Sequence, residues 1–167
     1  VPVLIDLHGP ALRATIAARP SIVKINLAEF VSTFIPDRFV SAEHGGVLAQ
    51  DVLPSDVLTA VADVSREHAT SFVLTRGARS VLLARNGDVR VVPVTPLAAH
   101  ETLNTIGSGD SFLAGMLTTL LEEETNGDWS AFPLATLEKA IHFATACAQS
   151  NARTWRPGFL EDSFVRC

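Results

Sequence analysis

The chain has 167 residues, a formal net charge of −5, 47% hydrophobic residues and 19% charged residues. This length suits one domain with a packed core, so we predict a single domain over residues 1–167. The sequence shows no basic stripe, which argues against nucleic acid, and no apolar run that predicts a membrane span. The two cysteines, Cys147 and Cys167, and the lack of a signal peptide predict a reducing, cytoplasmic setting.

Apolar runs and helical periods alternate along the first half of the chain. Pro36 ends one helical period, and the residues from Pro54 to Asp56 are expected to cap another. The segment 37–53 has no clear period and is expected to be a loop or irregular insertion. We expect strands at residues 3–6, 21–25 and 71–75, and helices at residues 12–18, 26–34 and 56–68.

The second half begins with a hairpin signal. Asn86-Gly87 lies between apolar runs at residues 81–85 and 89–94, which predicts two antiparallel strands. One amphipathic helix is expected from Asp110 to a stop before Asn126, and another over residues 134–152. The apolar face expected for the first of these helices consists of Phe112, Leu113, Met116, Leu117, Leu120 and Leu121.

Strands that alternate with helices, followed by a hairpin, predict an α/β domain with a mostly parallel sheet flanked by helices. Sheets of this kind bind ligands outside the carboxyl ends of their strands. We therefore searched for functional residues where an expected strand gives way to a turn or a helix.

The stretch from Asn104 to Phe112 reads Asn-Thr-Ile-Gly-Ser-Gly-Asp-Ser-Phe. Gly107 and Gly109 allow a tight turn that leaves backbone N–H groups uncovered at a helix start, where the helix dipole favours an anion. Asp110 adds a carboxylate at the same end, which suits removal of a proton from a nucleophile that attacks a phosphate. The alternative is structural, because an Asp in a first helical turn is favoured by the dipole alone.

Two common nucleotide motifs fail at this stretch. No Lys-Ser or Lys-Thr follows the glycines, which excludes the Walker pattern. Phe112 occupies the place of the third glycine in the dinucleotide fingerprint.

The same nine residues, followed by Ala114-Gly115, resemble the signature of the ribokinase-like (PfkB) carbohydrate kinases. The resemblance implies a ribokinase-like fold and transfer of the γ-phosphoryl group of ATP to a sugar hydroxyl. It implies that Asp110 is the base and that Gly107, Ser108 and Gly109 form an anion hole. Thr105, within the same signature, is expected to contribute to ATP binding.

The segment from Lys24 to Glu29 resembles the family's Lys-Pro-Asn-x-x-Glu element, with Ile25 in place of proline. The resemblance implies that Lys24 contacts ATP phosphate and that Asn26 and Glu29 help to hold Mg²⁺, Glu29 through water. The alternative from the residues alone is a capping box, with Asn26 as the helix cap and Glu29 as its partner.

Three further segments resemble family elements. Thr75 and Gly77 match a Thr-x-Gly turn that touches the nucleotide, although Ser80 stands where the family often has a second glycine. Ala144 belongs to an alanine-rich segment that resembles the helix beside the adenine pocket. Pro157-Gly158 resembles the closing Pro-Gly of the family.

The resemblance covers residues 3–158 and only the later half of the family's chain. The family's sugar-binding strands, early Gly-Gly element and β lid precede the segment that aligns with Val1, so we expect a C-terminal, nucleotide-binding portion of a longer kinase. The expected ligands are ATP, Mg²⁺ and a small sugar or sugar phosphate, and a homo-oligomer is possible. The motifs favour the branch of 1-phosphofructokinase and tagatose-6-phosphate kinase.

Several alternatives remain open at this point. Ribokinase, fructokinase and nucleoside kinases belong to the same family. Two further alternatives belong to other functional classes. One is a nucleotide-binding fragment without turnover of its own, and the other is a structural or regulatory remnant.

Overall fold

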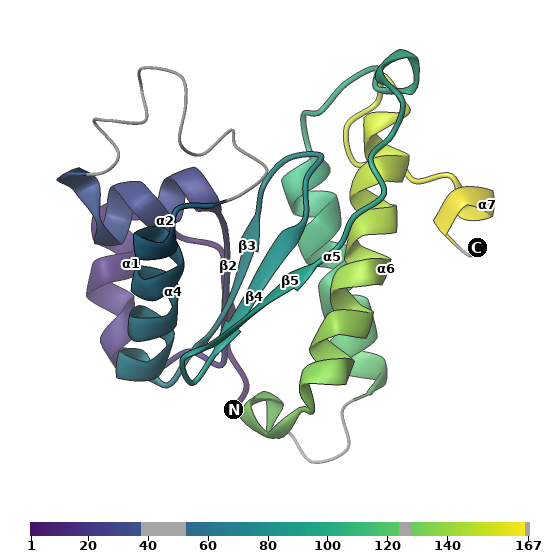
Figure 1. The fold of residues 1–167 in the computed structure, drawn as a ribbon. Helices are drawn as coiled ribbons and strands as arrows, with labels where there is room; N and C mark the ends of the chain where they lie inside the picture. Colours follow the sequence, from purple (N-terminus) through teal and green to yellow (C-terminus); the bar gives the residue numbers. More distant parts are fainter. Residues whose placement is uncertain (38–52, 124–127, 166–167) are drawn as a thin grey trace. The chain divides into compact units, whose positions relative to one another are not determined.

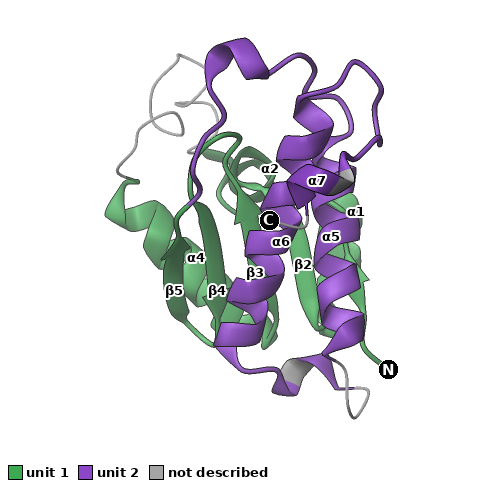
Figure 2. Ribbon diagram, turned by 90° about the vertical axis from the view of Figure 1, so that its right-hand side faces the viewer, with its two compact units in different colours: residues 1–93 green, residues 94–167 purple. Residues whose placement is uncertain are grey.

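The computed structural model describes residues 1–37, 53–123 and 128–165. Its α/β architecture confirms the fold class expected from the sequence. The chain divides into two compact units, unit 1 (residues 1–93) and unit 2 (residues 94–167), which have different colours in Figure 2. The irregular segment expected at residues 37–53 lies almost wholly outside the described residues.

Unit 1 contains a five-stranded sheet in the order β1-β2-β3-β4-β5. β1, β2 and β3 pair in parallel, and β4 pairs antiparallel with both of its neighbours. The turn between β4 and β5 holds Asn86 and Gly87 at φ values of 51° and 87°, as expected for an Asn-Gly hairpin. The strands are β1 (Leu4–Ile5), β2 (Ile22–Asn26), β3 (Ser71–Thr75), β4 (Val81–Arg85) and β5 (Asp88–Val92).

Helices α1 (Gly9–Thr15), α2 (Leu27–Phe34) and α4 (Ser55–His68) lie on one face of this sheet (Figure 1). α1 begins earlier than expected because Pro10 fits the first turn of a helix, and a 3₁₀ turn (Ile16–Ala18) continues it. The expected cap of α4 is confirmed in part: Pro54 is the cap residue, but no side chain caps the helix by a hydrogen bond.

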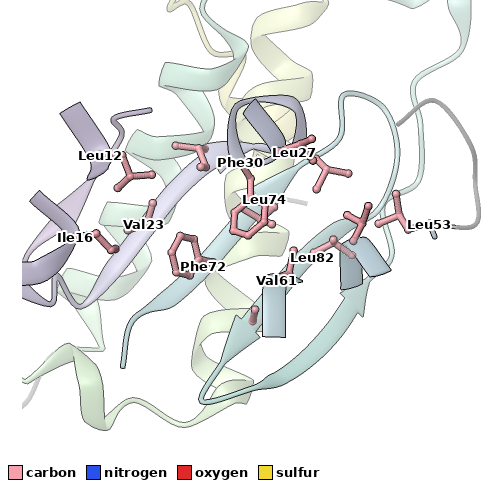
Figure 3. Close-up of a cluster of buried hydrophobic side chains, with 14 residues drawn as sticks. Leu12, Ile16, Val23, Leu27, Phe30, Leu53, Val61, Phe72, Leu74 and Leu82 are labelled. Atoms are coloured by element: carbon pink, nitrogen blue, oxygen red, sulfur yellow. The ribbon is translucent and has the colours of Figure 1, made fainter. Parts of the chain in front are cut away.

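The core of unit 1 fills the space between these helices and the sheet. Figure 3 shows the cluster, in which Phe30 of α2 meets Phe72 of β3 edge to face with ring centroids 5.7 Å apart. Val23 and Ile25 of β2 also join the cluster. Because side chains alternate along a strand, Lys24 between them points to the opposite face of the sheet.

Unit 2 contains two long helices, α5 (Ser108–Glu122) and α6 (Leu134–Ala152), which lie antiparallel and side by side (Figure 1). Short helical segments accompany them at Ala99–Glu101, Trp129–Ala131 and α7 (Asp162–Val165). None of the helices in the described part of the chain is long and apolar enough to cross a membrane.

The apolar face expected for α5 is partly wrong. Phe112, Met116 and Leu120 are buried as expected, but Leu121 is 60% exposed. Small residues complete the buried stripe instead, because Ser111, Gly115 and Thr119 are the other buried residues of α5. A stripe of alternating large and small residues lets a second helix approach closely.

The two helices approach each other closely at Gly115. A Cβ atom built on Gly115 would lie 2.7 Å from Cys147 Sγ and 3.0 Å from the Cα atom of Ala144. Both neighbours belong to α6 and are buried. The space for any side chain at residue 115 is therefore absent, and the glycine sets the separation of α5 and α6.

We expect Gly115→Ala to destabilise the protein by about 1–3 kcal/mol, because the added methyl group overpacks the α5–α6 contact. Helix propensity acts in the opposite direction and alone would stabilise this variant by about 1 kcal/mol. Urea unfolding of the wild type, Gly115→Ala, Cys147→Ala and the double variant measures the balance. Cys147→Ala should recover part of the loss in the Gly115→Ala background. A Gly115→Ala protein more stable than the wild type would contradict the close contact.

Candidate functional site

In unit 1, candidate residues meet at the carboxyl ends of two neighbouring strands. Asn26 ends β2, Thr75 ends β3, and the two are register partners in the parallel pair. Gly77 follows two residues later with φ of 63°, and a Cβ atom there would meet nothing within 4 Å. The structure thus brings Asn26 and Thr75 together at the sheet edge where α/β proteins bind ligands.

Asn26 and Glu29 form a capping box at the start of α2. Glu29 N donates to Asn26 Oδ1, and Asn26 N donates to Glu29 Oε2, each at 2.8 Å. This confirms the structural alternative for these two residues, although it does not exclude a second role. Each capping bond uses one side-chain oxygen, and oxygen ligands are those that Mg²⁺ prefers.

No group of three or more His, Cys, Asp or Glu side chains that could hold a metal ion occurs among the described residues. A divalent cation at Glu29 would therefore take most of its ligands from water and from phosphate oxygens. Mg²⁺ commonly binds in this way, through one or two carboxylates. The residues fit such a cation, and the assignment stays a prediction.

Lys24 is 5% exposed, and its Nζ atom lies 2.8 Å from Asp6 Oδ2. Asp6 follows β1 directly, next to β2, so the parallel pairing brings the two side chains together. A buried ammonium group needs such a partner, because removal of a charge from water costs several kcal/mol. Asp6 could not be predicted from the sequence as the partner of Lys24. The two residues are 18 positions apart, and only the pairing of β1 with β2 brings them together.

In unit 2, the glycine loop opens α5 as expected. Gly107 is the cap residue with φ of 81°, and no side chain caps the helix by a hydrogen bond. Gly109 and Asp110 are exposed in the first turn. Ser111 N donates to Gly107 O at 2.9 Å, and Ser108 N donates to Thr105 O at 3.2 Å. The amides of Gly109 and Asp110 have no acceptor within the helix, as for any first turn.

The last turn of α6 holds the segment that leads into this loop. The carbonyl oxygen of Ala152 accepts hydrogen bonds from Leu103 N at 2.8 Å and from Asn104 N at 3.1 Å. Arg153 donates to Glu101 Oε1 at 2.6 Å. These bonds fix residues 101–104 against the carboxyl end of α6.

Asn151, in the same turn of α6, is completely buried and hydrogen-bonded on both sides of its amide. Its Nδ2 atom donates to Ile106 O at 2.9 Å and to Ser108 Oγ at 3.0 Å. Its Oδ1 atom accepts from Gly158 N at 2.6 Å. The sequence analysis missed this residue, because nothing in its local pattern distinguishes it from a polar residue on an exposed helix face.

Ala144 and Thr105, two other residues predicted to bind ATP, have structural roles. Ala144 is fully buried and lies close to Gly115. Thr105 is exposed, and its backbone carbonyl oxygen accepts a hydrogen bond from Ser108 N. Their assignment to ATP binding stays a prediction. Burial raises the pKa of the Cys147 thiol, which makes this cysteine a poor nucleophile.

Residues 1–155 match the family model described as pfkB family carbohydrate kinase. The chain is 34% identical over 115 residues to 1-phosphofructokinase of Rhodobacter capsulatus, which covers 69% of this chain and 31% of that protein. It is also 38% identical over 53 residues to adenosine kinase 2 of Arabidopsis thaliana, covering 32% of this chain and 15% of the relative. The chain thus spans about a third or less of these relatives.

Solved structures show the same fold. Phosphofructokinase-2 from Escherichia coli, in complex with potassium, superposes with a TM-score of 0.70 at 19% identity, covering 99% of this chain and 45% of that one. Fructokinase from Vibrio cholerae, with bound fructose, ADP and calcium ion, superposes with a TM-score of 0.63 at 20% identity, covering 93% and 42%. These likenesses confirm the ribokinase-like fold expected from the sequence.

The buried Lys24–Asp6 pair predicts an asymmetry between two substitutions. We expect Asp6→Asn to cost about 1–3 kcal/mol, because it leaves a buried ammonium without its charged partner. Lys24→Met should cost less, because the remaining Asp6 side chain is 30% exposed and water can solvate it.

Urea unfolding measures both variants. Lys139→Met is the matched control, because it breaks an exposed pair with Glu123 and should change the stability by less than about 1 kcal/mol. A Lys24→Met variant less stable than Asp6→Asn would contradict the argument.

Proposed function

Because the chain belongs to the pfkB family of carbohydrate kinases, we propose that it is the nucleotide-binding part of a sugar or sugar-phosphate kinase. The enzyme transfers the γ-phosphoryl group of ATP to a hydroxyl group of its acceptor. The observation that carries this proposal is the Gly107-Ser108-Gly109-Asp110 loop at the start of α5, with its exposed carboxylate beside helix N–H groups.

Asp110 accepts the proton of the acceptor hydroxyl. Its carboxylate is exposed in the first turn of α5, so an incoming hydroxyl group has access to it. The transition state of phosphoryl transfer is loose, and the nucleophile therefore needs little activation. An ordinary carboxylate is sufficient as the base.

The glycine loop stabilises the transferring phosphoryl group. Backbone N–H groups at a helix start and the positive end of the helix dipole both favour a phosphate. Gly107, Ser108 and Gly109 form this anion hole in the proposal. Ser108 N already donates to Thr105 O, so the amides at Gly109 and Asp110 supply most of the attraction.

In unit 1, Lys24 is the proposed source of positive charge for the phosphates of ATP, and to reach them it must give up or share its ion pair with Asp6. Asn26 and Glu29 would hold Mg²⁺, Glu29 through water, and both could do so while they keep their capping bonds. The metal ion, when bound, neutralises negative charge on the phosphates. Within unit 1, Thr75 and Gly77 contact the nucleotide at the end of β3. In unit 2, Thr105 keeps the ATP-binding role that the family resemblance implies, and Ala144, which is fully buried, supports that role only through the packing of α6.

The acceptor in the proposal is a sugar phosphate, because the relative that is 34% identical over 115 residues is named 1-phosphofructokinase. The match to adenosine kinase 2 favours a nucleoside as the second candidate. An ATP-consumption assay on the complete gene product with sugars, sugar phosphates and nucleosides separates the two. ATP binding without turnover by any acceptor would support a nucleotide-binding protein instead.

We expect Asp110→Asn to lower kcat by about 10²–10⁴-fold, which is the usual contribution of a general base. ATP binding should change little. Asp56→Asn is the comparison variant, because Asp56 also lies in the first turn of a helix, α4, but outside the proposed site. Steady-state kinetics of the complete gene product measure both. A near-normal kcat for Asp110→Asn would remove this residue from the mechanism.

Glu29→Gln separates the capping role of Glu29 from the metal role. Glutamine keeps the capping box, because its side-chain oxygen still accepts from Asn26 N. It loses the negative charge that attracts Mg²⁺. We expect a slightly lower melting temperature, because the negative charge at the start of α2 is lost. We also expect a half-saturating Mg²⁺ concentration raised by roughly tenfold, equivalent to about 1.4 kcal/mol. An unchanged Mg²⁺ dependence would leave Glu29 with the capping role only.

A further inference from the structure

We infer that Asn151 is a positioning residue, which holds the Gly107-Ser108-Gly109 loop in the geometry that receives the phosphoryl group. The inference rests on the proposed function, because it assigns a purpose to the loop that Asn151 holds. Asn151 itself is completely buried and is not expected to touch a substrate.

The hydrogen bonds of Asn151 connect three separate segments of unit 2. Its amide nitrogen donates to Ile106 O and Ser108 Oγ, on either side of Gly107. Its oxygen accepts from Gly158 N in the segment after α6. Only a side-chain amide both donates twice and accepts at this size. Aspartate keeps the acceptor and loses the donors, whereas leucine has neither.

Gly107 and Asn151 are matched to each other. Gly107 has φ of 81°, in the left-handed region that favours glycine. A Cβ atom at this position would also lie 3.3 Å from Asn151 Oδ1 and 3.4 Å from Gly158 N. The glycine therefore provides both the turn and the room in which the amide of Asn151 reaches the loop.

The bonds to Ala152 O hold Leu103 and Asn104, which precede the loop, and few other bonds among the described residues reach residues 106–108 from outside their own segment. No side chain caps α5 by a hydrogen bond, and the side chain of Ile106 is 70% exposed. The bonds from Asn104 Oδ1 to Ile106 N and from Ser108 N to Thr105 O are internal to the segment. Asn151 instead connects the loop to a 19-residue helix. A rigid support of this kind matters because a shift of about 1 Å in a positioned group costs about 10²-fold in rate.

The test compares Asn151→Asp with Ser150→Ala in the complete gene product. Ser150 is the neighbouring residue, is also completely buried, and accepts from Glu161 N at 2.7 Å. Its loss disturbs the same helix end but leaves the bonds to the loop intact. We expect Asn151→Asp to lower kcat by roughly 10–100-fold with a smaller change in the KM for the acceptor. Ser150→Ala should retain kcat within about threefold, since it moves no group that acts on the reaction.

Amide hydrogen exchange supplies a readout that needs no activity. Exchange at residues 106–110 should accelerate in Asn151→Asp and not in Ser150→Ala. If the wild type transfers no phosphoryl group, the proposed function fails, and the exchange comparison still decides whether Asn151 positions the loop. Unchanged exchange in a folded Asn151→Asp variant, or a loss of kcat that Ser150→Ala matches, would overturn the inference.

If Asn151→Asp does not fold, Ser108→Ala decides. It removes the hydroxyl acceptor of Asn151 Nδ2 at a half-buried position. We expect faster exchange at residues 106–110 with a melting temperature close to that of the wild type. Unchanged exchange in Ser108→Ala would overturn the inference by this route.

Discussion

The structure of unit 2 depends on hydrogen bonds between the end of α6 and the segment that leads into α5. A polar side chain, a backbone carbonyl and an ion pair from three consecutive residues, Asn151, Ala152 and Arg153, contact residues 101–108. The close contact at Gly115 fixes the two helices against each other. The start of α5 therefore inherits its position from a packed helix pair, although the loop itself is glycine-rich and would otherwise have many conformations.

In unit 1, strand pairing and an ion pair hold the candidate residues in place. The parallel register places Asn26 beside Thr75 at the ends of β2 and β3, and the ion pair with Asp6 holds Lys24. Each unit thus holds charged groups and backbone dipoles in place by hydrogen bonds among the described residues. That combination suits phosphoryl transfer, in which positioning and charge stabilisation supply most of the catalysis.

Local patterns predict much of this structure from the sequence. The period of α6 gives its bounds at Leu134–Ala152, and Asn86-Gly87 specifies the hairpin, because both signals lie within a few neighbouring residues. The residues that could not be predicted have partners far away in the sequence. Asp6 pairs with a residue 18 positions away and Asn151 with residues 43 and 45 positions away, so only the tertiary structure reveals them. Leu121 fits the helical period, but the buried residues of α5 form a narrower stripe than that period predicts, and Leu121 is 60% exposed.

In the proposed function, the loop at the start of α5 receives phosphate. The most direct measurement is a titration of the complete ¹⁵N-labelled gene product with Mg²⁺ and a non-hydrolysable ATP analogue, following the amide signals of Gly107, Ser108, Gly109 and Asp110. The account predicts that the signals of Gly109 and Asp110 shift most, because their N–H groups have no acceptor within the helix, and that the shifts saturate with the analogue. Signals that stay unchanged at saturation would contradict the account.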